Sequence, residues 1–239
     1  MTTSVVTGAS TGIGRAIAQE LGGPGNTVAL LGRNIQGLNE TAKLVSARGG
    51  TAVVVPCDLS SIESITEAAA QVVSRGRVDV IANVAGVWHN SEKAYQGPLL
   101  FATPASEIAE VLDAGLRGNV ILTSLLLPAM VPYKAGHVIN ISGTFSSGAK
   151  GWLHYYISKK GMESFTVGLA QELRDSEIQV NCVSPADVAT EAYLRFYPEY
   201  AASAVKPEEV AEVVRTLLEP AMRHVSGAIM EVRNRKDHE

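Results

Sequence analysis

The sequence predicts an α/β protein in which about seven parallel strands form a sheet with helices on both of its faces. Short apolar runs alternate with longer stretches of helical periodicity along the whole chain, which is the order expected of repeated strand–helix units. The apolar runs are continuous rather than alternating, as in strands that are covered on both sides. No linker or internal repeat interrupts this pattern, so we expect residues 1–239 to form a single domain.

The composition excludes several classes of protein. Hydrophobic residues make up 46% and charged residues 18% of the 239 positions, which is typical of a folded globular chain. A net charge of −4 argues against nucleic-acid binding, which needs basic patches. No apolar run reaches about 18 residues, so no membrane span is expected. The first strand begins almost at once and leaves no room for a signal peptide, so we expect a cytoplasmic protein.

The cysteines and histidines indicate no metal and no redox centre. Cys57 and Cys182 each end an apolar run and are expected to be reduced core thiols, although a disulfide between them stays open. The five histidines show no metal-ligand spacing, so no metal is predicted.

A glycine-rich turn follows the first predicted strand, residues 4–7, and leads into a helix that includes residues 16–21. Its glycines allow positive φ and close backbone approach, and the free N–H groups of a helix N-terminus suit a pyrophosphate. A tight turn without a ligand is the alternative, but three glycines in this order favour a Rossmann-type, doubly wound fold that binds a dinucleotide. The expected cofactor contacts here are Thr7, Gly8, Ser10, Thr11, Gly12, Ile13 and Gly14.

The second strand, residues 27–31, ends at a position that distinguishes the two nicotinamide cofactors. In dinucleotide-binding folds an acidic residue here binds the ribose hydroxyls of NAD, whereas an arginine accommodates the 2′-phosphate of NADP. The chain has Arg33 and no acid at this point, so NADP(H) is favoured over NAD(H). The alternative for Arg33 is a solvated surface side chain.

The next strands end in further candidate contacts. Helix 35–48, strand 51–56, helix 62–74 and strand 78–82 follow in order. Asp58, next to Leu59, is placed to accept a hydrogen bond from an adenine amino group, although Asp58 or Ser60 could instead cap the following helix. The small residues after the fourth strand lie where ligands bind in open α/β sheets, and the candidates are Asn83, Ala85 and Gly86.

The second half of the chain completes the alternation. The expected elements are a loop at 87–97, a helical region at 104–128, a strand at 137–141, a helix at 155–175, a strand at 178–183, a helix at 207–218 and a strand at 227–232. Residues 187–205 are expected to form a lid over the substrate. Candidate pocket or lid side chains are Trp88, Trp152, His154, Tyr193, Phe196 and Tyr197.

Four motifs in register resemble the short-chain dehydrogenase/reductase family over essentially the whole chain. They are Thr7-Gly8-x-x-x-Gly12-x-Gly14, Asn83-x-Ala85-Gly86, Tyr155-x-x-x-Lys159 and Asn181-x-x-Ser184-Pro185. The resemblance implies a strand order of 3-2-1-4-5-6-7 with NAD(P) across the carboxyl ends of the strands. It also implies cofactor contacts at Pro185, Val188, Thr190 and the Tyr155–Lys159 pair.

The pair Tyr155 and Lys159 suits carbonyl reduction. Hydride transfer to a carbonyl leaves an oxyanion that a nearby phenol can protonate. A lysine one helical turn further on lies on the same face and favours the phenolate. Tyr156 and Lys160 repeat the spacing, but the run Ser158-Lys159-Lys160-Gly161 matches the family only in the register of Tyr155.

The chain departs from the family pattern at the residue that anchors the substrate carbonyl. Counting back thirteen residues from Tyr155 gives Ser142 (155 − 142 = 13), whereas matching the strand itself puts Gly143 in the position of the family serine. Ser142 is our prediction for the catalytic hydroxyl, and Thr144 and Ser146 are the alternatives.

Further departures concern the usual catalytic asparagine and the nicotinamide. Gly115 occupies the asparagine position in Asp113-Ala114-Gly115-Leu116-Arg117-Gly118, and Asn119 lies one turn further on. Ala186 replaces the usual glycine after Pro185, and Arg233-Asn234 replaces the family's Gly-Gly after the last strand.

The sequence therefore predicts an NADP(H)-dependent oxidoreductase that acts on the carbonyl or alcohol of a small-to-medium apolar molecule. The departures keep open an alternative, a cofactor-binding protein of the same fold with little or no catalysis and a redox-sensing or interaction role. The resemblance also implies a homodimer or homotetramer formed through helices at about 106–130 and 155–175. The apolar runs on these helices could equally pack only on their own sheet.

Overall fold

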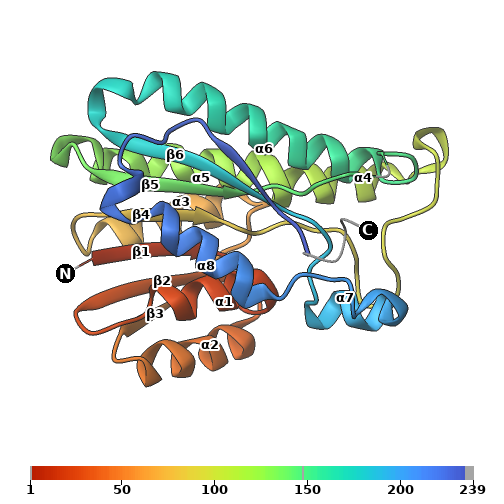
Figure 1. The fold of residues 1–239 in the computed structure, drawn as a ribbon, viewed down its shortest axis with the longest axis horizontal. Coiled ribbons are helices and arrows are strands. Elements are labelled where there is room, and N and C mark those ends of the chain that lie inside the picture. The colour runs from red at the N-terminus through yellow and green to blue at the C-terminus, as the bar shows by residue number, and fades with distance from the viewer. Residues whose placement is uncertain (1, 147, 235–239) are drawn as a thin grey trace.

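A computed structural model describes residues 2–146 and 148–234. Seven strands, all paired in parallel, form one sheet in the order β3-β2-β1-β4-β5-β6-β7 (Figure 1). The strands are β1 (Thr2–Thr7), β2 (Asn26–Gly32), β3 (Thr51–Pro56), β4 (Val80–Asn83), β5 (Gly136–Ile141), β6 (Ile178–Pro185) and β7 (Ile229–Val232). The predicted doubly wound parallel sheet is confirmed.

Helices cover both faces of this sheet. One face carries α1 (Gly12–Leu21), α2 (Ile35–Ala47) and α8 (Pro207–Leu217), whose apolar sides share one hydrophobic cluster. The other face carries α3 (Ile62–Val73), α4 (Ala105–Leu112), α5 (Gly118–Leu126) and α6 (Leu153–Glu172). The short α7 (Glu191–Phe196) lies beyond the carboxyl ends of the strands (Figure 1).

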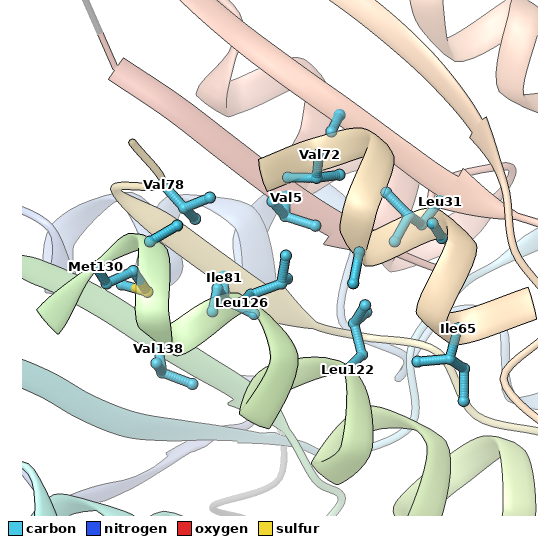
Figure 2. Close-up of a cluster of buried hydrophobic side chains, with 14 of the residues drawn as sticks. Val5, Leu31, Ile65, Val72, Val78, Ile81, Leu122, Leu126, Met130 and Val138 are labelled. Carbon is cyan, nitrogen blue, oxygen red and sulfur yellow. The ribbon is translucent and has the colours of Figure 1, made fainter. Parts of the chain in front are cut away.

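The two hydrophobic clusters hold the layers together. Figure 2 shows Val5 and Ile81 from the sheet meeting Ile65 of α3 and Leu122 and Leu126 of α5. All five side chains are fully buried. Burying a side chain of this size contributes about 1.5–3 kcal/mol relative to leaving it exposed. These contacts fix the strand ends against which the functional side chains are placed.

Hydrogen bonds from one threonine join the ends of β1 and β4. The Thr7 hydroxyl accepts hydrogen bonds from the backbone N–H groups of Val84 (2.9 Å) and Ala85 (3.0 Å). It donates to the side-chain oxygen of Asn119 at the start of α5 (3.0 Å). Because the crossovers from β1 and β4 run to opposite faces, a crevice opens between these ends, and a ligand can bind there.

The helical region predicted at 104–128 is interrupted at its centre. A single π-helical turn, Asp113–Arg117, separates α4 from α5, and the chain continues into a 3-10 turn, Leu127–Ala129. The glycines explain how closely this region packs, since a Cβ on Gly118 would collide with the carbonyl oxygen of Leu59. π turns are rare and occur mostly at functional sites.

One helical stretch among the described residues, Ala105–Ala129, is long and apolar enough to cross a membrane, judged by length and composition alone. Its apolar side chains Leu122, Leu126 and Ala129 belong to the hydrophobic cluster against the sheet. The core helices of globular proteins meet the same criterion.

Both cysteines are buried, free thiols. Burial, reinforced by the charge of Asp58, raises the pKa of Cys57 to about 11. The disulfide that the sequence left open is therefore not formed.

Candidate functional site

A cavity of about 1000 Å³ runs along the carboxyl ends of the strands, from Arg33 and Asp58 at one end to a group of aromatic rings at the other. It brings together nearly all the predicted site residues. Those that line it are Thr7, Gly8, Ser10, Thr11, Gly12, Ile13, Gly14, Arg33, Asp58, Leu59, Ala85, Gly86, Ser142, Tyr155, Lys159, Pro185, Val188 and Thr190.

The glycine-rich turn forms a close-fitting cradle at the start of α1. Gly8 and Gly12 have φ of 65° and 53°, a conformation that favours glycine. A Cβ on Gly14 would collide with the carbonyl oxygen of Gly8, and a Cβ on Gly12 would lie 2.9 Å from Thr190. The side chain of Thr11 forms no cap hydrogen bond, so the first N–H groups of α1 face the cavity free to bind an anion.

Two arginines lie near the end of the cavity at Asp58, but only one is without an ion pair among the described residues. Arg15 is engaged by Glu40 (2.9 Å) and by the carbonyl oxygen of Ser10 (2.6 Å). Within the described part of the chain Arg33 is exposed at the cavity and forms no ion pair. Arg33 is therefore the arginine free to meet a phosphate.

Asp58 faces the cavity and accepts hydrogen bonds from the backbone N–H and the hydroxyl of Ser60 (3.0 and 2.7 Å). Burial works to raise the pKa of its carboxyl, but these hydrogen bonds and the charge of Arg33 outweigh burial and lower the pKa. The alternative in which Asp58 or Ser60 caps the next helix is wrong, because Ser61 caps α3 by accepting from the N–H of Ser64 (3.2 Å).

Asn83, in contrast, is placed in the core. Its side chain is 1% exposed and donates to the hydroxyl of Thr123 and the side-chain oxygen of Asn140, both at 2.8 Å. It is not among the described residues that line the cavity. Asn83 supports the end of β4 from beneath, a role that the sequence could not distinguish from cofactor contact because both place the residue at a strand end.

Tyr155 and Lys159 lie together on the cavity side of α6. The amine of Lys159, only 4% exposed, donates to the carbonyl oxygen of Ile141 (3.1 Å) and lies 5.5 Å from the centre of the Tyr155 ring. Burial lowers the pKa of Lys159 to about 8, against a small opposing effect of Cys182. Burial, followed by the charge of Asp187, raises the pKa of Tyr155.

The repeated pair one residue further on points elsewhere. Lys160 is held by both oxygens of Glu163 at 2.8 and 2.9 Å. Neither Tyr156 nor Lys160 is among the described residues that line the cavity. One residue on a helix turns a side chain by about 100°, which separates the two pairs.

Ser142 and Gly143 both reach the cavity, but they face different neighbours. A Cβ on Gly143 would lie 3.9 Å from the side chain of Lys159 and 3.7 Å from the Phe145 ring. The hydroxyl of Ser142 is buried and has no partner within hydrogen-bond geometry among the described residues, but it interacts with the thiol of Cys182 and lowers the pKa of that thiol, an effect that burial outweighs. Thr144 and Ser146, the alternative hydroxyls, also line the cavity.

The position of the family asparagine is closed by a neighbouring side chain. A Cβ on Gly115 would collide with the hydroxyl of Ser158, the residue before Lys159. Asn119 does not take over this position, because its amide donates to the carbonyl oxygens of Ala85 (3.0 Å) and Ala114 (3.1 Å) and its oxygen accepts from Thr7.

Aromatic rings form the far end of the cavity. The predicted pocket residues that line it are Trp88, Trp152, Tyr193 and Tyr197, which we call the aromatic wall. Trp88 stacks on Tyr197 with ring centres 6.3 Å apart, and Trp152 lies 5.8 Å from Tyr155. Two further predictions fall behind this wall: Phe196 packs on Trp88 at 5.9 Å, and His154 is 2% exposed with its ring 3.6 Å from Glu107.

Phe145 and Asp187 are among the cavity residues that sequence reasoning did not single out. Asp187 follows Pro185 and Ala186 after β6 and is the first residue of the predicted lid, so its place in the chain was a usable signal. Its side-chain direction depends on the path of the lid, which the sequence does not reveal.

Comparisons with known proteins agree with this geometry. A family model described as short chain dehydrogenase matches residues 2–200. The chain is 29% identical over 241 residues to the 3-oxoacyl-[acyl-carrier-protein] reductase FabG of Aquifex aeolicus, covering 96% of this chain and 94% of the relative.

Solved structures are similar over nearly the full length. An actinorhodin polyketide ketoreductase variant with NADPH superposes with a TM-score of 0.88 and 29% identity, covering 100% of this chain and 98% of the other. A metagenomic short-chain oxidoreductase in complex with NADP superposes with a TM-score of 0.79 and 31% sequence identity, covering 97% of this chain and 95% of the other.

Proposed function

The chain belongs to the short-chain dehydrogenase family of oxidoreductases, and from this premise we propose that it is an NADP(H)-dependent enzyme. It transfers a hydride between nicotinamide and the carbonyl or alcohol carbon of a small-to-medium, largely apolar molecule. The observation that carries the proposal is the buried Lys159 beside Tyr155 in a cavity continuous with the glycine-rich turn.

The residues of the cavity fit a dinucleotide phosphate. Glycine at positions 8, 12 and 14 lets the turn pack closely against Ala85, Thr190 and its own backbone, and the start of α1 to which the turn leads suits a pyrophosphate. Arg33 binds the 2′-phosphate, and Asp58 accepts a hydrogen bond from the adenine amino group. Bound NADPH supplies the hydride, and the names of similar structures with NADPH and NADP support this cofactor.

The proton comes from the chain itself. The hydroxyl of Tyr155 protonates the carbonyl oxygen as the carbonyl carbon gains the hydride, so that the C=O group becomes an alcohol and Tyr155 becomes a phenolate. Positive charge on Lys159 stabilises that phenolate until water returns the proton. Ser142, with its unpartnered buried hydroxyl, is the proposed anchor for the carbonyl oxygen.

Family membership supports a proposal for the oligomeric state and the location. We infer a homodimer or homotetramer in the cytoplasm, in which helices α5 and α6 of neighbouring copies meet. Residues 187–205 serve as the lid, since the bridge between Val188 and Val205 closes this segment at its base.

Two neighbouring tyrosines provide a matched test of the catalytic role. Purified wild type, Tyr155→Phe and Tyr156→Phe are assayed with NADPH against a panel of ketones, and the binding of NADPH is titrated for each. We expect Tyr155→Phe to lose about 10²–10⁴-fold in turnover with NADPH affinity nearly unchanged, because a general acid contributes this much. Tyr156→Phe also removes a phenolic hydroxyl, but one that lies outside the cavity. We expect this variant to retain turnover.

Equal activity of all three proteins would contradict the role of Tyr155. A wild-type protein that binds NADPH tightly but reduces no ketone would favour the alternative function, a cofactor-binding protein with little catalysis.

A further inference from the structure

One acidic side chain, Asp187, lies at the substrate end of the cavity. Its backbone is fixed at the base of the lid, where its carbonyl oxygen accepts a hydrogen bond from the N–H of Val205 (2.8 Å). Its side chain is exposed to the cavity and, in the part of the chain that the structure describes, forms no ion pair. Asp187 thus presents a negative charge to the cavity without an ion-pair partner among the described residues.

The charge of Asp187 acts on three tyrosines that line the same cavity. The hydroxyl of Tyr193 interacts with this carboxylate directly, and its charge also reaches Tyr155 and Tyr197. Burial, followed by the charge of Asp187, raises the pKa of each of these three phenols. All three hydroxyls therefore stay neutral and add no charge of their own beside Asp187.

Among the described residues, no cationic side chain of this region forms an ion pair with it. Arg195 donates to the carbonyl oxygen of Ser91 and lies 5.1 Å from the Phe196 ring, and Arg233 is paired with Glu231 at 2.7 Å. Glu191, also at the cavity, adds a second negative charge.

Aromatic faces complete the surroundings. Trp88, Trp152, Tyr193 and Tyr197 line the same end of the cavity. Such rings attract a cation placed over their faces, by about 0.5–2 kcal/mol depending on desolvation. A carboxylate together with several aromatic rings forms a site with chemistry suited to an ammonium group.

We propose that the substrate is a carbonyl compound with an ammonium group, which binds between Asp187 and the aromatic wall while its carbonyl meets Tyr155. This inference rests on the proposed function and specifies its substrate class. It also removes a conflict between two charges: the charge of Asp187 opposes ionisation of Tyr155, whereas that of Lys159 favours it. An ammonium next to Asp187 cancels that opposition when substrate is bound.

The test uses three methyl ketones that differ only in a distal group. One carries trimethylammonium three methylenes from the carbonyl, one carries the isosteric neutral tert-butyl group, and one carries a carboxylate. Their kcat/KM values with NADPH are compared for wild type, Asp187→Asn and Glu191→Gln. Glu191→Gln is the matched control, since it removes a different acidic group from the same cavity.

For wild type we expect the ammonium ketone to exceed the tert-butyl ketone in kcat/KM by roughly tenfold or more, and the carboxylate ketone to be poorest. Asp187→Asn should reduce this preference severalfold or more, and by clearly more than Glu191→Gln does. As a readout independent of turnover, benzyltrimethylammonium should quench tryptophan fluorescence of the wild type more strongly than neopentylbenzene, its neutral isostere.

Reduction of the tert-butyl ketone with equal or better efficiency than the ammonium ketone would overturn this inference while leaving the proposed function intact. A preference that survives Asp187→Asn would also overturn it. Failure to reduce any ketone would count against the proposed function instead, and quenching by benzyltrimethylammonium would then still decide whether a cation binds.

Discussion

At the scale of single residues, the candidate site balances burial against charge. Lys159 is buried and its amine donates to one backbone carbonyl. The loss of water around the amine therefore makes its charged form less favourable. This is why its pKa falls to about 8, well below that of a free lysine. A phosphate or phenolate brought next to it restores the charge.

The depressed pKa of Lys159 gives a pH prediction with a definite sign. The penalty for burying its charge is full below the folded pKa of about 8 and is released as the pH rises toward the unfolded value, so stability rises across that window. Enzymatic activity should fall over the same pH range, because Lys159 loses the positive charge that favours the Tyr155 phenolate. We expect kcat/KM for NADPH, which reports groups of the free enzyme, to fall as the pH rises through about 8. A profile that stays flat to pH 10 would contradict this role.

Residues differ in how far the sequence could place them. The choice of Tyr155 over Tyr156 was possible because a helix with known register turns neighbours away from one another. The placement of Asn83 could not be predicted, because the direction of a polar side chain at a strand end depends on partners far away in the chain. Here these partners are Thr123 and Asn140. Ser61 took the cap that the sequence assigned to its neighbours, since capping requires a backbone conformation as well as a side-chain oxygen.

At the scale of elements, the strands and helices followed from apolar periodicity, whereas their ends and one internal turn did not. The start of α6 at Leu153 and the π turn at Asp113–Arg117 arise from tertiary packing around glycines. A second feature of these helices concerns their outer faces. Leu125 of α5 and Ile157 and Val167 of α6 are exposed by 37%, 45% and 39%.

These exposed apolar side chains are expected to be covered by a second copy of the chain. Wild type should have a mass of two or four chains of 25.2 kDa in sedimentation or light scattering. Val167→Glu should shift the protein toward the monomer, because it places a charge in the apolar contact. Ile35→Glu, which alters a similarly exposed apolar residue on α2 at the other face of the sheet, is the control and should leave the mass unchanged. A monomeric wild type would contradict the proposed association.

At the scale of the whole molecule, the strand order explains the position of the site. Since β1 lies between β2 and β4, crossovers leave it and β4 toward opposite faces, and the crevice between their carboxyl ends extends into the cavity (Figure 1). The cavity joins Arg33 at one end to Tyr155 and the aromatic wall at the other. This arrangement lets one extended cofactor connect the turn that holds phosphate with the residues that handle protons.

The measurement that tests this account most directly is titration of the protein with NADPH and, separately, with NADH, followed by fluorescence, for wild type and Arg33→Ala. We predict that wild type binds NADPH at least roughly tenfold more tightly than NADH, since charge-assisted hydrogen bonds to the 2′-phosphate contribute about 1.5–3 kcal/mol. Arg33→Ala should reduce this preference and leave NADH binding nearly unchanged. Tighter binding of NADH would contradict the assignment of Arg33, and binding of neither cofactor would contradict the account as a whole.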